Sequence, residues 1–510
     1  MGRWPDRSSK GRSRIRVRWR ASLGLLGSIL KWLAVPLAFP LLLAVLYQEP
    51  VLPFAVTMAI TLALGEGLER LPEDEEIRGR EAYLLVALAW LAVAVIGAIP
   101  FLLAGNGVLA QPVDALFESM SGVTTTGATV LDDFSVHGRA ILMWRQVLQW
   151  LGGLGILVLA ISVLSQLSVG GAQLMETETQ TQDVTKLSPR ITETARMMWG
   201  LYGGITALCA VSLYALSVVG VAPNMDAYNA IAHAMTAVAT AGFSPSPDSV
   251  GAFAPVAQWL VVPFMFVGAT NFVLIYYFVR GDWGRPLRNE EFRYYVGIVA
   301  GTTVLMTLLL VTDPGVTFPA EATVRHAVFQ VVSILTTTGF ATVDFNTWSP
   351  AARHLLFALM FLGGMAGSTT CSIKLLRWVI VAKSLRRDLF TAVHPEAIRP
   401  VRLGDRVVDE ETIRDVYAYT LLSLLIFFAL TVFIVVDGTR SGVTVSEFEA
   451  MAAAASTFLN IGPAFGFAGP YGSYGPFSNA TKSAMILLMW VGRIEIIPVL
   501  VVATPAYWRS

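Results

Sequence analysis

The stretch Ser119-Met-Ser-Gly-Val-Thr-Thr-Thr-Gly127 decides the fold of this chain, because three related stretches follow it. These end at Gly242, Gly339 and Gly462, so that successive glycines are 115, 97 and 123 residues apart. A hydroxyl or amide residue lies two positions before each glycine, and a hydroxyl residue lies six positions before it: Thr125, Thr240, Thr337 and Asn460, then Ser121, Thr236, Ser333 and Ser456. Long apolar segments flank every copy. Four copies of such a unit in one chain predict a pore with pseudo-fourfold symmetry.

The composition places the chain in a membrane. Of its 510 residues, 55% are hydrophobic and 14% are charged, against about 25% charged in ordinary soluble domains. Several apolar runs reach the roughly 20 residues that a helix needs to cross a bilayer. The net charge of zero gives no electrostatic support for a nucleic-acid partner. Cys209, Cys371 and the five histidines show no metal-binding or disulfide spacing, and no nucleotide-binding P-loop is present, so neither an enzyme nor an organic cofactor is expected.

The apolar pattern predicts an all-α polytopic protein with about ten membrane-spanning helices and four re-entrant pore segments. A basic N-terminus, 1–21, precedes two extra helices in 22–79. The four repeats are expected at 80–170, 196–284, 285–382 and 411–510, with linkers at 171–195 and 383–410. Within the repeats, the second helices are expected near 141–166, 255–280, 353–382 and 480–505.

Loop charges predict the orientation. The linker 383–410 and the segment that joins the second and third repeats are rich in arginine, whereas the loops beside the pore segments carry acids such as Asp132 and Asp248. Basic loops stay cytoplasmic, so the pore segments are expected to enter from outside and the N-terminus to lie inside. The run from Ala21 to Tyr47 is open to two interpretations, a signal peptide or an uncleaved first helix. Its length and the lack of a clear A-x-A site favour the helix.

The four glycine stretches have the chemistry of an ion path. Non-helical backbone is tolerated at membrane depth only where protein or water satisfies it, and a loop that replaces the hydration shell of an ion with carbonyl oxygens meets that condition. Glycine supplies the backbone angles at little steric cost. A helix ending in a glycine cap is the alternative for any single copy. The candidate filter residues are Thr124, Thr125, Thr126, Gly127, Ala239, Thr240, Ala241, Gly242, Thr336, Thr337, Thr338, Gly339, Leu459, Asn460, Ile461 and Gly462.

Several stretches together resemble a known family. They are Leu116–Ala128, Trp150-Leu-Gly-Gly-Leu-Gly-Ile156, Thr240-Ala-Gly-Phe243, Leu335-Thr-Thr-Thr-Gly-Phe340 and Asn460-Ile-Gly-Pro463, with Ser188–Ala195 after the first repeat. The chain resembles the Trk/Ktr/HKT superfamily of cation transporters over residues 30 to 505, and the two extra N-terminal helices favour its TrkH branch.

The resemblance implies potassium uptake across the bacterial cytoplasmic membrane through a four-loop filter. Glycine at all four filter positions goes with potassium in that family, whereas a serine in the first repeat goes with sodium in some plant members. It also implies a homodimer in lipid on a cytosolic nucleotide-binding ring of the TrkA type. Sodium or mixed-cation transport, channel or symport behaviour, a membrane-embedded enzyme and a structural subunit are the alternatives.

A gate is predicted below the filter. Gly363-Gly-Met-Ala-Gly-Ser-Thr-Thr-Cys-Ser372 interrupts an apolar helix, which weakens it and requires burial or water. Close helix packing through small residues is the alternative. The stretch resembles the intramembrane gate loop of the family, although Thr369 to Ser372 stand where glycines are usual. The candidate gate residues are Gly363, Gly364, Gly367, Ser368, Thr369 and Arg493.

Other polar residues also lie in apolar context. An intramembrane arginine is costly and typically functional. The resemblance places Arg493 opposite the gate loop, and a salt bridge with Glu495 is the alternative. Lys374 is expected just beyond the gate. Nine positions before their glycines lie Glu118, His233, Gln330 and Ala453, which are interpreted as a pore-helix face bonded to loops, with attraction of cations the alternative for Glu118.

Overall fold

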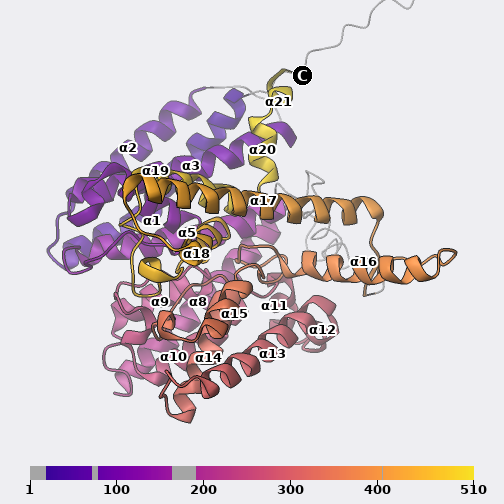
Figure 1. The fold of residues 1–510 in the computed structure, drawn as a ribbon. Helices are drawn as coiled ribbons and strands as arrows, with labels where there is room; N and C mark the ends of the chain where they lie inside the picture. The colour runs from indigo at the N-terminus through magenta and orange to yellow at the C-terminus, as the bar shows by residue number, and fades with distance from the viewer. Residues whose placement is uncertain (1–18, 72–78, 163–190, 405, 510) are drawn as a thin grey trace, which may run out of the picture.

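The computed structural model describes residues 19–71, 79–162, 191–404 and 406–509, and these residues are mainly helical, with loops between the helices. Within the described residues, the strands β1 (Arg402–Leu403) and β2 (Arg406–Val407) form an antiparallel hairpin, in which Arg402 pairs with Val407. Most of the basic N-terminus and most of the linker 171–195 lie outside the described residues. The helices α16 and α17 project together from one side of the helical body (Figure 1).

Two helices precede the repeats, α1 (Trp19–Leu46) and α2 (Leu52–Glu69). They cross closely, because a methyl group placed on Gly27 would lie 2.6 Å from the carbonyl oxygen of Gly65. Small residues at such a crossing let two helices approach each other in lipid. The pair therefore packs as one unit beside the first repeat.

Each repeat follows the predicted order of long helix, short helix and second helix. The first contains α3 (Gly79–Ala104), α4 (Pro112–Val123) and α5 (Arg139–Ser162). The second contains α8 (Ile191–Val218), α9 (Ala227–Val238), α10 (Pro255–Gly268) and α11 (Phe272–Val279), and α12 (Gly284–Arg288) follows it. The third contains α13 (Glu290–Thr312), α14 (Ala320–Leu335), α15 (Pro350–Leu359) and α16 (Leu375–Val393). The fourth contains α17 (Glu410–Ser441), α18 (Glu447–Phe458), α19 (Asn479–Arg493) and α20 (Ile497–Ala503), before α21 (Pro505–Arg509).

The short helices α4, α9, α14 and α18 are too short to cross a bilayer, at 12, 12, 16 and 12 residues. Local sequence sets where they begin. Asp226 accepts a hydrogen bond from the backbone of Asn229 at the start of α9, and Ser446 and Glu449 form a capping box at the start of α18. Such caps satisfy backbone N–H groups that have no partner within the helix.

The second helices of the second and fourth repeats were expected to be continuous, and that expectation is wrong. The α10–α11 pair bends by 108° and the α19–α20 pair by 113°. Asn271 begins α11 by accepting hydrogen bonds from the backbone of Val273 and Leu274. In the fourth repeat, Glu495 and Ile496 adopt φ values of 61° and 43°, a conformation that side chains disfavour, so tertiary contacts hold this break.

The third repeat has its break where the sequence predicts it, between α15 and α16, over residues 360–374. The helix α16 then continues to Val393, well into the segment expected as the linker 383–410. Six helices in the described part of the chain are long and apolar enough to span a membrane, and the two bent pairs make eight. Adding α5 and the broken α15–α16 pair to these eight gives the expected number of about ten spans.

Candidate ion pathway

The four glycines meet in a closed ring. A methyl group placed on each glycine would collide with the carbonyl oxygen of the residue just before the glycine of the next repeat. The distances are 2.3 Å from Gly127 to Ala241, 1.9 Å from Gly242 to Thr338, 2.1 Å from Gly339 to Ile461, and 2.8 Å from Gly462 to Thr126. The contacts run from repeat one to two, three, four and back to one. The chain therefore arranges its four stretches around one axis, at a spacing that only glycine permits.

The backbone of the four stretches repeats the same unusual conformation. The residues two positions before the glycines have left-handed φ angles: Thr125 54°, Thr240 51°, Thr337 53° and Asn460 57°. The glycines follow at 81°, 81°, 79° and 111°. Threonine rarely adopts positive φ, and such strain persists only where the surroundings impose it. The same strained turn in four copies shows that tertiary packing holds each loop in one shape.

Hydrogen bonds fold each loop back onto its short helix. The backbone N–H of the residue before each glycine donates to the carbonyl oxygen six positions before that glycine. The distances are 2.9 Å for Thr126 to Ser121, 2.9 Å for Ala241 to Thr236, 2.8 Å for Thr338 to Ser333, and 2.9 Å for Ile461 to Ser456. The turn directs successive backbone groups away from helical geometry, which frees loop carbonyl oxygens for other partners.

All four glycines line a single cavity of about 240 Å³. Its walls also include Asp132, Arg145 and Tyr471. Burial raises the pKa of the Tyr471 hydroxyl, with nearby carboxylates acting in the same direction, so this group is neutral at physiological pH. Among the described residues there is no cluster of three or more histidine, cysteine or acidic side chains that could hold a metal ion. The four glycines themselves contribute only backbone atoms to the lining of this cavity.

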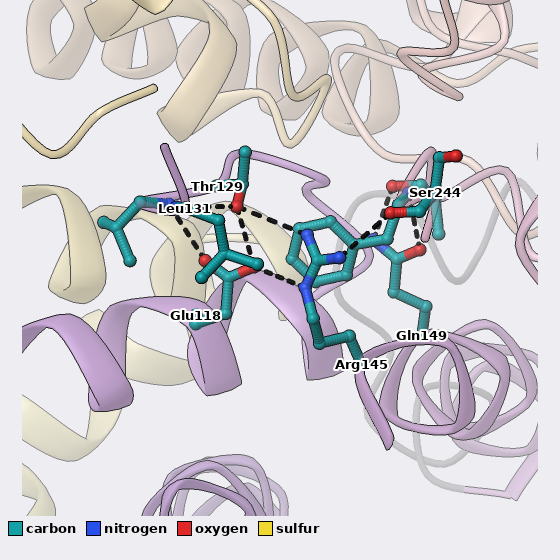
Figure 2. Close-up of polar contacts among 9 residues, drawn as sticks. Glu118, Thr129, Leu131, Arg145, Gln149 and Ser244 are labelled. Carbon is teal, nitrogen blue, oxygen red and sulfur yellow. Dashed lines mark hydrogen bonds and ion pairs between the residues drawn. The ribbon is translucent and has the colours of Figure 1, made fainter. Parts of the chain in front are cut away.

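The polar residues nine positions before the ring glycines form hydrogen bonds to the loops that follow the short helices. Glu118 accepts hydrogen bonds from Thr129 Oγ1 and the Val130 N–H, both at 2.9 Å, and pairs with Arg145 Nε at 2.7 Å (Figure 2). His233 Nε2 lies 3.0 Å from Ser244 Oγ. These contacts agree with the interpretation of a pore-helix face bonded to loops. Attraction of cations by Glu118 does not fit, because its side chain is fully buried and paired.

The interrupted segment 360–374 lies against the ring on the side of the threonines. Thr369 Oγ1 is 2.9 Å from Thr240 Oγ1, and the Cys371 N–H donates to Thr337 Oγ1 at 3.1 Å. Cys371 Sγ also lies 3.9 Å from Thr125 Oγ1. The segment therefore contacts three of the four loops, whereas the cavity is lined by the glycines.

The break between α10 and α11 holds this segment in place. Met365 N–H donates to the carbonyl oxygen of Ala269 at 3.0 Å, and Thr369 N–H donates to that of Gly268 at 3.2 Å. Asn271 Nδ2 donates to the carbonyl oxygen of Ala366 at 2.8 Å. The bend in the second repeat, which the sequence did not reveal, therefore supplies the groups that hold the interrupted segment of the third repeat.

Arg493 is buried, with 1% of its surface exposed, and it touches the loop directly. Its Nη1 donates to the carbonyl oxygen of Thr369 at 3.0 Å and lies 2.7 Å from Cys371 Sγ. Its Nη2 donates to the carbonyl oxygen of Gly152 at 2.8 Å. The structure thus brings together the sequence-predicted arginine and loop, and it links both to α5.

Glu495 has a different partner from the one considered in the sequence. Its carboxylate pairs with Arg377 at 2.6 Å, and no carboxylate in the described chain lies within ion-pairing distance of Arg493. The alternative of an Arg493–Glu495 salt bridge is therefore wrong. Lys374 stands at the start of α16, directly after the loop, and bonds to the backbone and hydroxyl oxygens of Thr370.

Comparisons with known proteins identify the family. A family model described as TrkH, cation transport protein, matches residues 53–510. The Trk system potassium uptake protein TrkH of Halomonas elongata is 35% identical over 503 residues, which cover 96% of this chain and 99% of that protein. Its Escherichia coli K12 counterpart is 34% identical and covers 97% and 100%. The crystal structure of the potassium transporter TrkH from Vibrio parahaemolyticus superposes with a TM-score of 0.86 at 30% identity, covering 96% of this chain and all of that one.

The chain belongs to the TrkH family of cation transport proteins. The prediction of an all-α membrane protein with four fused repeats around one pore and two extra N-terminal helices is confirmed. The expectation that the chain is a transport protein rather than an enzyme is confirmed as well.

Sequence reasoning missed several polar residues of this TrkH-family core. Arg145 and Gln149 contact the loops from α5, and Lys482 on α19 pairs with the buried Asp114 of α4. A charge within an apolar helix was the signal that singled out Arg493. The same signal at Arg145 and Lys482 was available and was not used.

Glycines of the second helices were also missed. Methyl groups on Gly152, Gly268 and Gly492 would lie 2.0, 2.7 and 1.9 Å from carbonyl oxygens at the ends of the short helices α4, α9 and α18. These glycines let each second helix press against the end of its short helix. In the third repeat, Gly363 and Gly364 instead face the interrupted segment and the α10–α11 break.

Proposed function

We propose that this protein carries potassium into the cell through the ring of four glycine stretches. The closed cycle of contacts between each glycine and the next repeat's carbonyl oxygen supports this proposal most directly. Relatives named as potassium uptake proteins match the chain over nearly its whole length. A cation sheds water at the ring and is held by backbone oxygens, as carbonyl-lined filters require.

The filter in this proposal comprises the sixteen residues that the sequence singled out. Glycine at each ring position allows four loops to approach one axis, and a side chain there would enter the space of a neighbouring carbonyl. Sodium or mixed-cation transport is the alternative for the same ring. Potassium is favoured because no ring position carries serine.

The gate in this proposal consists of Gly363, Gly364, Gly367, Ser368, Thr369 and Arg493. The segment closes the path on the threonine side of the ring, since it contacts Thr125, Thr240 and Thr337. Arg493 holds the segment and sets a positive charge beside the path. Like charges repel more strongly in a low-dielectric site than in water, so the closed state presents both a steric and an electrostatic barrier.

The basic linker 383–410 and the N-terminus face the cytoplasm in this proposal, and the glycine-lined cavity faces outward. The bacterial inner membrane is then the location, and the membrane potential supplies the inward driving force. A homodimer on a cytosolic ring of the TrkA type completes the assembly.

Growth of a potassium-uptake-deficient bacterium on low potassium tests the proposal. We expect rescue that is stronger when a TrkA-type partner is co-expressed, together with rubidium uptake that excess sodium does not block. A protein that inserts in the membrane but gives sodium uptake without potassium uptake would establish the alternative. Failure to transport either ion in the presence of the partner would remove the proposed function.

A further inference from the structure

We propose that Gln149 on α5 is a positioning residue that tunes ion discrimination by holding the loop of the second repeat, with Arg145 one turn away supporting it. This inference rests on the proposed function of the ring, to which it adds a specificity-determining contact. Figure 2 shows the two side chains reaching from one helix towards the loops of two repeats.

Gln149 forms hydrogen bonds to the loop of the second repeat on both sides of Gly242. Its Nε2 donates to the carbonyl oxygen of Ala241 at 2.6 Å, and its Oε1 accepts from the N–H of Phe243 at 2.9 Å. The Ala241 oxygen is the same atom that a methyl group on Gly127 would strike at 2.3 Å. One side-chain amide thus fixes a carbonyl group that belongs to the ring, and its own polar atoms are both satisfied.

Arg145 forms further hydrogen bonds, one to the loop of the second repeat and one to the loop of the first. Its Nη1 donates to the carbonyl oxygen of Ser244 at 3.0 Å, and its Nη2 donates to Thr129 Oγ1 at 3.3 Å. Its Nε pairs with Glu118 at 2.7 Å, where the two side chains are 1% and 0% exposed. Arg145 therefore ties the first repeat's loop to the second, with its charge balanced inside the protein.

The other three repeats have no polar side chains at the positions that correspond to Arg145 and Gln149. The repeats are aligned on one glycine of each second helix. Gly152, Gly268 and Gly492 make the same contact with the ends of their short helices. Gly364 is as far in sequence from its ring glycine as Gly152 is from its own. The positions of Arg145 and Gln149 are then occupied by Val261 and Met265, Phe357 and Phe361, and Met485 and Met489. Apolar residues pack these positions in three repeats, so packing alone does not require the polar pair in the first.

The asymmetry points to ion selection. A buried ion pair gives little net stability compared with apolar residues of similar volume, and polar groups at membrane depth are typically functional. Discrimination between potassium and sodium depends on the positions of the ring oxygens or on the field that they exert. A hydrogen bond from Gln149 to the Ala241 oxygen controls both quantities, because it fixes the carbonyl group and draws on its electron density.

The variant Gln149→Met tests this role, because methionine is the residue found at the same position in the second and fourth repeats. We expect the ratio of rubidium to sodium uptake to fall about fivefold, the factor that one buried hydrogen bond of ordinary net strength is worth. The matched control is Gln258→Met, which removes a buried amide whose Nε2 donates to the Phe253 carbonyl oxygen at 2.9 Å and whose Oε1 accepts from Arg325 on α14, neither partner being a ring residue. It should leave the ratio unchanged.

A second variant keeps the test decisive should Gln149→Met insert poorly. The pair Glu118→Gln with Arg145→Met removes both buried charges together and should also lower the ratio. A wild-type protein that takes up rubidium selectively, with both variants inserted and at the wild-type ratio, would overturn the inference and leave the proposed function intact. A wild-type protein without rubidium uptake would instead remove the proposed function.

Discussion

Replacing Arg493 by alanine should raise potassium flux about tenfold. Arg493 donates to the Thr369 carbonyl oxygen at 3.0 Å, and hydrogen bonds that involve a charged group contribute about 1.5–3 kcal/mol. Its charge adds a second barrier, near 3 kcal/mol for two unit charges roughly 6 Å apart at an effective dielectric of about 20. Screening by water and by the loop lowers that value to roughly 1–2 kcal/mol, and about 1.4 kcal/mol corresponds to a tenfold change in rate.

Rubidium uptake by proteoliposomes, with and without the regulatory partner, measures this effect. Two companion variants separate the causes. Arg493→Lys keeps the charge but loses the planar fork that reaches Thr369 and Gly152 together, and Arg493→Gln keeps a donor without the charge. If the charge dominates, lysine should transport close to wild type and glutamine close to alanine. If the tether dominates, lysine and glutamine should both exceed wild type.

One result for the Arg493→Ala variant would contradict this prediction. An Arg493→Ala protein that is folded and inserted, yet transports no faster than wild type, would show that Arg493 is structural. In that case its contacts with Cys371 and Gly152 would hold α5 and α19 together rather than restrain the loop, and the gate assignment would have to be dropped.

Three further outcomes follow from the same geometry. Gly127→Ser should reduce the ratio of potassium to sodium uptake at least tenfold, since its Cβ would lie 2.3 Å from a neighbouring carbonyl oxygen; Gly297→Ser, where the structure is open, is the control, and equal ratios would place the filter elsewhere. Gly492→Ala, with its Cβ 1.9 Å from a pore-helix carbonyl oxygen, should lower the amount of folded protein in detergent thermal scans, and a melting temperature at or above wild type would contradict the packing. Cysteines introduced at Asp132 and Glu396, in a background without the native cysteines, should react with an impermeant reagent from outside only at Asp132, so external labelling of Glu396 would reverse the orientation.

The main features of the fold were available from the sequence for local physical reasons. Glycine adopts the positive φ of a tight turn at little steric cost, so four glycines in matching frame between apolar helices indicated four matching turns. Apolar length indicated spans, and the run of small residues after Gly363 indicated a broken helix, because glycine and serine weaken helices wherever they gather. These inferences concern the preferences of a segment for its own conformation, which a sequence records directly.

The candidate site was predicted only as far as its backbone. Arg493 was found because a lone charge in an apolar helix is conspicuous, yet its partners in the loop and α5 were not derivable from spacing. Gln149 and Arg145 lie near the first ring glycine in sequence, but their contacts with Ala241 and Ser244 join two repeats. A single sequence does not state which repeat a side chain will reach.

Sequence alone thus determined that the chain has four pore segments, glycine at each turn, and one weakened helix. Tertiary structure alone decided the cyclic order in which each glycine meets the next repeat's carbonyl oxygen. It also decided the bends of α10–α11 and α19–α20 and the pairing of Glu495 with Arg377. The physical reason is that these features compensate for one another across distant segments: the α10–α11 bend exposes the Ala269 carbonyl oxygen and the Asn271 amide, which then bind the loop. Neither segment prefers its shape by itself.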